Sequence, residues 1–307
     1  MSKVLFVTNK WATGSPGGPL TNNFHNLFNS FAQVRNEYYD TLFIDESQFI
    51  YGKHINDILP GYCLATKTDI VIICLLADSH LNPSLEVCKV LKNSNIKICF
   101  IWPDSHPFNI KQRLELQSVT DLNAIWDNRT PSTTNLENDW EAWVPQDETM
   151  FFSEESKHIN VSFIGSLRQP LRESFLRPLH NIFITGGQNE TNLTAYKYSD
   201  LIRNSKISLN FSGAMGFNQT KGRVYEILAC NTLLMENVND STRKRFKPGV
   251  EYVEFDSPDD LANKINYYLS NEEERKMIAK KGNLKYQQEY STTKFWNTLM
   301  DKLNETA

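Results

Sequence analysis

The sequence predicts an α/β protein of two Rossmann-like domains, and three observations support this fold class. The chain has 307 residues, of which 40% are hydrophobic, and this length suits two ordinary cores better than one. Short β-branched runs alternate with helical patterns through the first half, which is typical of a parallel sheet with helical crossovers. After a polar stretch that contains proline, a second series of the same kind follows.

The first predicted domain, residues 1–150, opens with a buried strand and then the glycine-rich segment GSPGGP. Apolar side chains three and four residues apart between residues 24 and 31 predict a helix after this segment. The other predicted elements are strands at residues 3–8, 41–44, 70–75, 96–102 and 124–126, and a helix at residues 84–92. The pattern then fades between residues 128 and 157, which indicates a crossover between domains.

The second predicted domain, residues 151–290, repeats the alternation. Its predicted strands are residues 160–165, 181–185, 206–211, 232–236 and 250–255, and its predicted helices are residues 198–203, 222–229, 240–246, 259–269 and 272–281. Proline and two acids near residue 258 suit the first turn of a helix. Residues 291–307 predict a last helix, which we expect to cross back to the first domain.

Bulk properties exclude several classes of function. The net charge of -4 gives no general attraction to nucleic acid or anionic lipid. The longest apolar run, residues 69–78, is about half of the ~20 residues that a spanning helix needs, and the N-terminus lacks a signal-peptide pattern. We therefore expect no membrane span and a cytoplasmic location.

Five single cysteines without a Cys-x-x-Cys pair predict core packing, and no P-loop or Gly-x-Gly-x-x-Gly motif occurs.

The most informative stretch is residues 211–231, where a predicted strand leads through a glycine-containing loop into a helix. Lys221, Arg223 and Glu226 stand near the start of that helix. A helix N-terminus offers free N–H groups, and two cations beside it suit a diphosphate, while Glu226 could accept hydrogen bonds from the hydroxyls of a ribose. From spacing alone, an amphipathic helix with solvated charges is an equally good interpretation.

Four segments in order resemble the C-terminal domain of group-1-like glycosyltransferases, and in particular the branch of the CgeB-type spore-maturation proteins. They are residues 221–230 (KGRVYEILAC), 233–236 (LLME), 246–252 (FKPGVEY) and 272–279 (EEERKMIA). The resemblance covers about residues 161–296. It implies a GT-B fold, with two Rossmann-like domains facing a cleft, an acceptor-side first domain and a nucleotide-sugar donor held by the second.

Carried over by position, Glu226 resembles the second glutamate of the family's Glu, seven residues, Glu motif, which implies binding of the ribose. The first glutamate would fall at Asn218, and this departure argues against a retaining mechanism. Lys221 and Arg223 would then face the diphosphate in place of a metal, because no Asp-x-Asp motif suited to magnesium follows a strand. No cofactor is implied besides the donor itself.

Other donor-binding candidates follow predicted strands, because strand carboxyl ends open onto the ligand crevice in this architecture. Arg168 follows the first strand of the second domain, with Arg172 as a further phosphate partner. Ser212 and Gly213 follow the strand at residues 206–211. Gly17 and Gly18 follow the first strand of the chain, where a backbone without Cβ atoms can approach a sugar or phosphate.

An inverting transferase needs a base for the acceptor hydroxyl. The candidates at strand ends are Asp78, His80, Asp104 and His106, with His25 in the first loop-helix junction. We favour Asp78 and Asp104, with His106 beside the latter.

The predicted function is metal-independent transfer of a sugar from a nucleotide-diphosphate donor to a hydroxyl acceptor, with a carbohydrate favoured. Five tryptophans in the first half suit sugar rings as well as they suit a core. One alternative acceptor is a hydroxymethylated base of viral DNA, which would demand a basic channel and an extruded base. Another alternative is a non-catalytic protein of the same fold that binds a nucleotide sugar or a carbohydrate.

Overall fold

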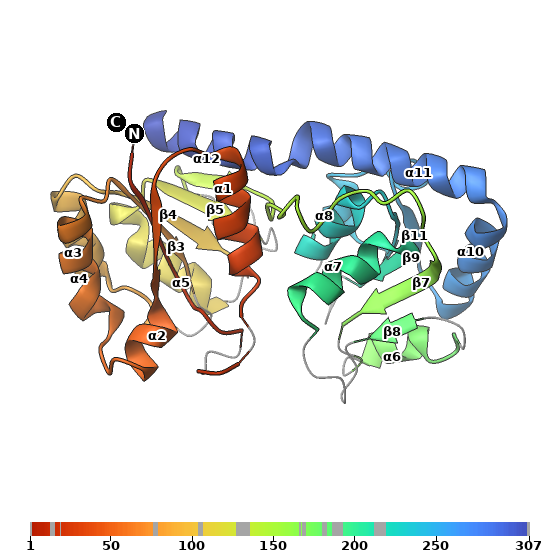
Figure 1. Ribbon diagram of the computed structural model, residues 1–307, viewed down its shortest axis with the longest axis horizontal. Coiled ribbons are helices and arrows are strands. Elements are labelled where there is room, and N and C mark those ends of the chain that lie inside the picture. Colours follow the sequence, from red (N-terminus) through yellow and green to blue (C-terminus); the bar gives the residue numbers. More distant parts are fainter. Residues whose placement is uncertain are drawn as a thin grey trace. The chain divides into compact units, whose positions relative to one another are not determined.

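The computed structural model describes residues 2–12, 16–18, 20–75, 79–103, 107–126, 136–165, 167, 170–179, 183–185, 193–211 and 219–305, with the backbone alone at residues 107–110, 170 and 183–185. The chain forms two compact units. Unit 1 comprises Met1–Trp143 and Thr293–Ala307, and unit 2 comprises Val144–Thr292. Each unit is an α/β structure around its own sheet (Figure 1).

The sheet of unit 1 has the strand order β2-β1-β3-β4-β5-β6, and every described pairing in it is parallel. Its strands are β1 (Val4–Thr8), β2 (Tyr39–Phe43), β3 (Ile70–Cys74), β4 (Lys97–Trp102), β5 (Leu122–Ile125) and β6 (Asp139–Glu141). β1 and β3 are buried along their whole length, as expected for central strands covered on both faces.

Helices cover both faces of this sheet. Its helical elements are η1 (Phe24–Asn29), α1 (Ser30–Val34), α2 (Ile44–Phe49), α3 (Ile55–Thr66), η2 (Ser79–Leu81), α4 (Leu85–Asn93), α5 (Pro107–Leu116), η3 (Gln117–Val119) and α12 (Thr292–Glu305). One face packs against α2, α3 and α4. On the other, Trp296 of α12 contacts Phe6 and Phe31 and donates a 2.9 Å hydrogen bond to Ser30 Oγ, so α12 packs against α1 and crosses it near one end (Figure 1).

Unit 2 has a parallel sheet of order β11-β10-β9-β7-β8. Its strands are β7 (Ile159–Ile164), β8 (Phe183–Thr185), β9 (Ser205–Asn210), β10 (Leu233–Asn237) and β11 (Val253–Phe255). Its helical elements are α6 (Pro170–Leu176), α7 (Ala195–Arg203), α8 (Gly222–Ala229), α9 (Asp240–Arg243), α10 (Pro258–Ser270), α11 (Glu272–Lys285) and η5 (Tyr286–Tyr290).

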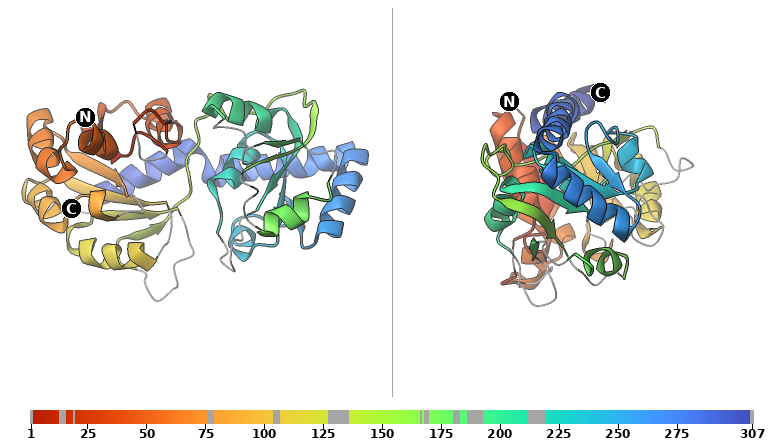
Figure 2. Two further views of the ribbon diagram at one scale, coloured as in Figure 1. Left: turned by 90° about the horizontal axis from the view of Figure 1, so that it is seen from below. Right: turned by 90° about the vertical axis from the view of Figure 1, so that its right-hand side faces the viewer.

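Helices α6, α10 and α11 pack on one face of this sheet, against Phe163, Leu209 and Met235 among others. Helices α7 and α8 contact β7, β9 and β10 and also one another. The views of Figure 2 show these helices around the sheet from two further sides. The predicted α/β class with parallel sheets is thus confirmed in both units.

The two sheets share one topology. Numbered within its own unit, each has the order 2-1-3-4-5, which unit 1 extends by a sixth strand. In such a sheet the chain leaves the first strand to one side and later returns to the other, so a crevice opens beyond the carboxyl ends of the first and third strands. This places the expected ligand crevice of unit 2 at the ends of β7 and β9.

Several predicted elements differ from the structure. The sequence pattern predicts no helix at α3 or α5, and it indicates a crossover in the segment that contains β6. α3 contains Pro60 and Gly61, which lower intrinsic helix preference, yet Leu59 and Cys63 are buried on one face and hold it in place. The strand predicted at residues 41–44 begins earlier, at Tyr39, and it ends at Phe43 because Ile44 already starts α2.

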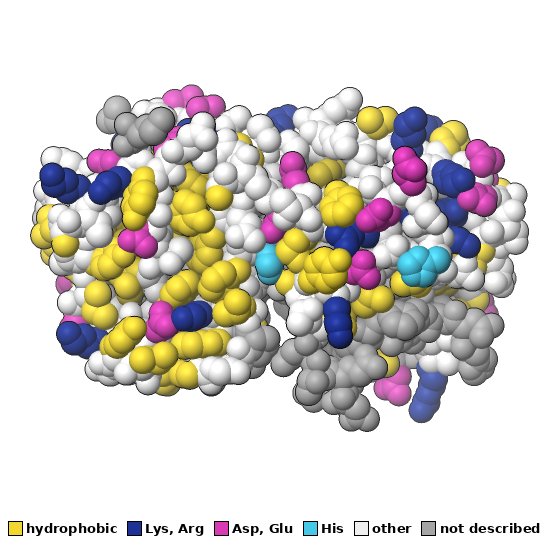
Figure 3. Space-filling view, in the orientation of Figure 1, with side chains coloured by type: hydrophobic (Ala, Val, Ile, Leu, Met, Phe, Trp, Pro, Cys, Tyr) yellow, Lys and Arg dark blue, Asp and Glu magenta, His cyan; other side chains and the backbone are white. Residues whose placement is uncertain are grey.

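The surface has one notable apolar run. Phe49, Ile50 and Tyr51, at the end of α2, are each more than half exposed, and apolar side chains are abundant on the visible face of unit 1 (Figure 3). Within the described residues, no helix is both long enough and apolar enough to cross a bilayer.

Two helical glycines lead to opposite predictions. A Cβ on Gly282 of α11 would lie 2.2 Å from the carbonyl oxygen of Glu251, whereas one on Gly61 of α3 would meet nothing within 4 Å. We expect Gly282→Ala to destabilise the protein by about 1–3 kcal/mol through overpacking. Gly61→Ala should stabilise it by up to about 1 kcal/mol through helix propensity. Urea unfolding followed by circular dichroism measures both, and equal shifts of the same sign would contradict the packing described for Gly282.

Candidate functional site

The candidate site lies at the carboxyl edge of the sheet of unit 2, where β7 ends at Ile164 and β9 ends at Asn210. Helix α8 starts near this edge, since Gly222 follows β9 after one loop. Helices α6 and α7 contribute one side chain each, Arg172 and Tyr198. The topology therefore brings polar side chains of three helices to one crevice.

A hydrogen-bonded cluster of Tyr198, Arg223 and Glu226 forms its centre. The hydroxyl of Tyr198 donates a short hydrogen bond to Glu226 Oε2, and Arg223 Nε donates to the same hydroxyl at 3.2 Å. The Tyr198 ring packs edge-on against Phe151. Glu226 is only 5% exposed, and no described residue donates a hydrogen bond to its other oxygen, Oε1. The tyrosine hydroxyl thus joins a cation to a buried carboxylate and leaves one carboxylate oxygen for a ligand.

Burial governs the ionisation of this cluster. It raises the pKa of Glu226 above the ordinary 4.5, and the hydrogen bond from Tyr198 and the charge of Arg223 act in the opposite direction. Burial also raises the pKa of Tyr198, with the charge of Glu226 as the next cause, so the phenol stays protonated and donates. For Arg223, burial lowers the pKa, but Tyr198 and Glu226 outweigh it and the net shift is upward.

Two arginines approach one another beside the cluster. Arg172 is 7% exposed, donates to the carbonyl oxygen of Phe211 at 3.4 Å, and lies 6.0 Å from the centre of the Phe163 ring. Burial lowers the pKa of Arg172, and the charge of Arg223 lowers it further. The two guanidinium groups lie at the end of a strand and repel one another. An anion that bound beside them would be attracted by both positive charges.

Gly165 brings Arg223 close to the end of β7. A Cβ at this position would lie 3.5 Å from Arg223 Nη1 and 3.1 Å from the Phe163 ring. A larger residue would therefore press on the guanidinium and the ring together. The glycine therefore lets the β7 backbone and the Arg223 side chain lie close together.

A buried polar network fixes the start of α8. Glu236, which is fully buried near the end of β10, accepts hydrogen bonds from Asn210 Nδ2 at 2.9 Å and Asn239 Nδ2 at 3.3 Å. Asn239 Nδ2 also donates to the carbonyl oxygen of Gln219 at 2.9 Å. The next residue, Thr220, is buried, and its Oγ1 has no hydrogen-bond partner among the described residues. The network ties the ends of β9 and β10 to the segment that carries Lys221, the half-buried N-cap residue of α8.

The predicted site residues fall into three groups. Lys221, Arg223 and Glu226 come together at the start of α8, as described above. Gly17 and Gly18 belong to unit 1, and the exposed Gly17 has a φ of 82°, which glycine adopts without strain. Six further candidates lie outside the described residues, namely Asp78, Asp104, His106, Arg168, Ser212 and Gly213, so their roles stay predictions.

The two other candidate bases, His25 and His80, both lie in unit 1. His25 is half-buried, with Nδ1 3.4 Å from Asn29 Nδ2. His80 is exposed in η2, and its carbonyl oxygen accepts a hydrogen bond from His54.

Near the end of β1 in the same unit, Asp45 accepts hydrogen bonds from the backbone N–H groups of Lys10 and Trp11 at 2.8 and 2.9 Å. These bonds anchor the backbone that leads into the glycine-rich segment.

Sequence reasoning did not single out Tyr198, Asn210 or Glu236, and it ranked Arg172 behind Arg168. Tyr198 opens a predicted helix, but nothing local distinguishes it from the other aromatic residues that pack in cores.

Among the described side chains, no group of three or more His, Cys, Asp or Glu residues is arranged to hold a metal ion. Independence from metal stays a prediction.

Residues 150–301 match the model of a family described as glycosyl transferase-like, and these residues include the whole cluster. This region, just under half of the chain, belongs to the glycosyl transferase-like family. The description does not name the CgeB-type branch, which stays a prediction. A search of curated proteins gave no match.

Solved structures resemble the whole chain. Anabaena Alr3699/HepE, crystallised with UDP-glucose, is 11% identical at a TM-score of 0.65, with 99% of this chain and 100% of that chain covered. A glycosyltransferase from Rickettsia africae is 10% identical at a TM-score of 0.62, with 99% and 98% covered. T4 phage BGT, in complex with its UDP-glucose substrate, is 12% identical at a TM-score of 0.57, with 98% and 99% covered. These likenesses show that the fold is GT-B, and with the family they make the protein a glycosyltransferase.

The cluster predicts a specific role for the Tyr198 hydroxyl. Tyr198→Phe leaves the buried carboxylate of Glu226 without its donor, so we expect a stability loss of about 1–3 kcal/mol. Tyr196→Phe is the matched control, because Tyr196 lies on the same helix and is 66% exposed. Urea unfolding at neutral pH measures both variants. The loss should shrink when Glu226→Gln is already present, and an equal loss in both backgrounds would contradict the coupling.

Proposed function

We propose that unit 2 binds a nucleotide-diphosphate sugar in this crevice and that the enzyme transfers the sugar to a hydroxyl group of a carbohydrate acceptor. The observation that carries the proposal is the cluster itself: two neighbouring arginines and a buried glutamate at the switch point of a parallel sheet. Each part of the donor has a chemical counterpart in this arrangement.

The diphosphate suits the cations. Arg172 and Arg223 repel one another in the absence of an anion, and a bridging diphosphate converts this repulsion into two charge-assisted interactions. Lys221 adds a third cation at the N-terminus of α8, where backbone N–H groups also favour negative charge. In the transfer step, the charge that develops on the leaving nucleotide diphosphate would be stabilised by these groups.

The ribose suits Glu226. Its Oε2 is held by Tyr198, which fixes the orientation of the carboxylate and leaves Oε1 to accept a hydrogen bond from a ribose hydroxyl. A carboxylate held in one orientation loses little conformational entropy when the ligand binds. Two of the similar structures contain UDP-glucose, so uridine diphosphate sugars are the first donors to test.

Three finer features belong to the proposal. Asp78, Asp104 or His106 would act as the base that takes the proton of the acceptor hydroxyl. The cations would serve without a metal ion, and the reaction would take place in the cytoplasm. A carbohydrate acceptor is preferred to DNA because the net charge of -4 opposes a polyanionic substrate.

The cation prediction tests the donor site. Replacing Lys221 and Arg223 together with Gln removes two charge-assisted contacts, so we expect the affinity for the preferred nucleotide sugar to fall by about a hundredfold or more. Lys197→Gln, an exposed position on α7, is the control and should bind normally. Calorimetric titration with UDP- and GDP-sugars measures affinity, and circular dichroism confirms folding. An unchanged affinity for every donor would refute the proposed site.

The pH prediction tests Glu226. The ionised carboxylate, which prevails above the raised pKa of Glu226, is the form that accepts hydrogen bonds from the ribose. Below that pKa the ligand must displace a proton, so we expect donor affinity to fall towards acid pH, with a midpoint above 4.5. Titrations with a nucleotide sugar at several pH values measure this dependence. Glu226→Gln should bind more weakly at neutral pH and lack that midpoint; an identical pH profile in the variant would exclude Glu226 as its source.

A further inference from the structure

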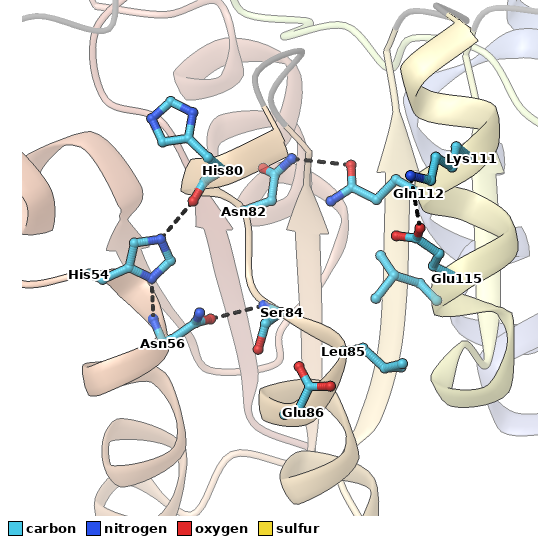
Figure 4. Close-up of a pocket in the computed structure, with 11 residues that line it drawn as sticks. His54, Asn56, His80, Asn82, Ser84, Leu85, Glu86, Lys111, Gln112 and Glu115 are labelled. Carbon is cyan, nitrogen blue, oxygen red and sulfur yellow. Dashed lines mark hydrogen bonds and ion pairs between the residues drawn. The ribbon is translucent and has the colours of Figure 1, made fainter.

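A second cavity lies in unit 1, on the side of the sheet that α3 and α4 cover. It has a volume of about 650 Å³ and is bounded by the starts of α3 and α4, by η2 and by one side of α5. In Figure 4, side chains from α5 lie across the cavity from those of α3 and α4. The volume is in the range of about 300–1,000 Å³ that small-molecule sites occupy.

One wall of the cavity is held by a chain of hydrogen bonds. His54 Nε2 donates to the carbonyl oxygen of His80 at 2.8 Å, and His54 Nδ1 accepts from the backbone N–H of Asn56 at 3.1 Å. The Oδ1 atom of Asn56 in turn accepts from the backbone N–H of Ser84 at 2.9 Å. These bonds use both ring nitrogens of His54 and fix the Asn56 side chain, so the wall is formed before any ligand arrives (Figure 4).

Two side-chain amides at the cavity have NH₂ groups without a hydrogen-bond partner among the described residues. The Oδ1 atom of Asn56 is engaged, but its Nδ2 has no hydrogen-bond partner among the described residues. Across the cavity, Gln112 Oε1 accepts from Asn82 Nδ2 at 3.4 Å, and the Nε2 of Gln112 is likewise without a partner in the described chain. Both side chains are half-buried. Ser84 adds a hydroxyl whose oxygen caps α4 by accepting from Val87 N–H at 3.3 Å.

The charges at the cavity do not suit an anion. Glu86 and Glu115 line it together with a single lysine, Lys111, which lies 3.7 Å from Glu115. Two carboxylates against one ammonium group disfavour phosphate or a carboxylic acid. They do suit hydroxyl groups, each of which can donate to a carboxylate and accept from an amide. Leu85 and Leu116 provide the small apolar area against which the C–H groups of a sugar ring can pack.

We propose that this pocket binds a neutral saccharide unit, held by the spare amide donors of Asn56 and Gln112 and by the carboxylates of Glu86 and Glu115. The proposal rests on the proposed function in one respect: the saccharide is part of the acceptor. Binding itself requires only the pocket. The pocket lies wholly in unit 1, whereas the donor cluster lies in unit 2, so the two can be tested separately.

The experiment titrates the ¹⁵N-labelled full-length protein with neutral methyl pyranosides of glucose, galactose, mannose and N-acetylglucosamine, and separately with inorganic phosphate. Nuclear magnetic resonance follows the side-chain amide signals of Asn56 and Gln112, assigned by their loss in Asn56→Ala and Gln112→Ala. We expect at least one pyranoside to shift both signals and phosphate to shift neither. Each alanine variant should weaken that binding about tenfold, the loss of one to two hydrogen bonds.

Controls separate this inference from the donor proposal. Asn93→Ala removes an exposed amide at the far end of α4 and should leave saccharide binding unchanged, and none of the three variants should alter the affinity for UDP-glucose. The inference is overturned if no pyranoside shifts these signals, if phosphate alone does, or if Asn56→Ala and Gln112→Ala both bind normally. Saccharide binding without any nucleotide-sugar binding would refute only the proposed donor site.

Discussion

The parallel arrangement of both sheets is the constraint on which the rest of the molecule depends. Parallel strands need a crossover for every pairing, and the crossovers cover both faces with helices. As a result, all strands of a unit end at the same edge, and all the loops that follow them start there. In unit 2, the order 2-1-3-4-5 separates the loops after β7 and β9, which opens a crevice where helix starts, backbone N–H groups and polar side chains can converge.

The polar groups at that edge are better explained by ligand binding than by stability. A half-buried cation and a buried carboxylate such as Arg223 and Glu226 lose much of their hydration, and a well-packed apolar pair of similar size is often at least as stable. The charge of Arg223 also lowers the pKa of Arg172, so the two guanidinium groups repel one another. A diphosphate of the kind proposed would offset this repulsion, and a ligand that binds only the folded protein stabilises it.

The supporting residues determine how well the site is organised. Asn210 and Asn239 both donate hydrogen bonds to the buried Glu236, and Asn239 also donates to the carbonyl oxygen of Gln219. Their effect on the site is to fix where α8 begins. Tyr198 contacts a candidate ligand-binding side chain directly, since its hydroxyl sets the orientation of Glu226. Preorganisation of this kind reduces the entropy that a ligand must lose on binding.

The sequence by itself determined the α/β class, most strands, and the loop and helix that carry Lys221, Arg223 and Glu226, because each depends on residues within a few positions of one another. It failed for α3, where Pro60 and Gly61 weaken the local pattern and tertiary burial of Leu59 and Cys63 overrides it. Only the tertiary structure decided that Tyr198 meets Glu226, 28 positions away, that Arg172 approaches Arg223, and that Asn56 and Gln112 line one cavity. Such pairs are set by how helices pack on a sheet, and no local spacing encodes that packing.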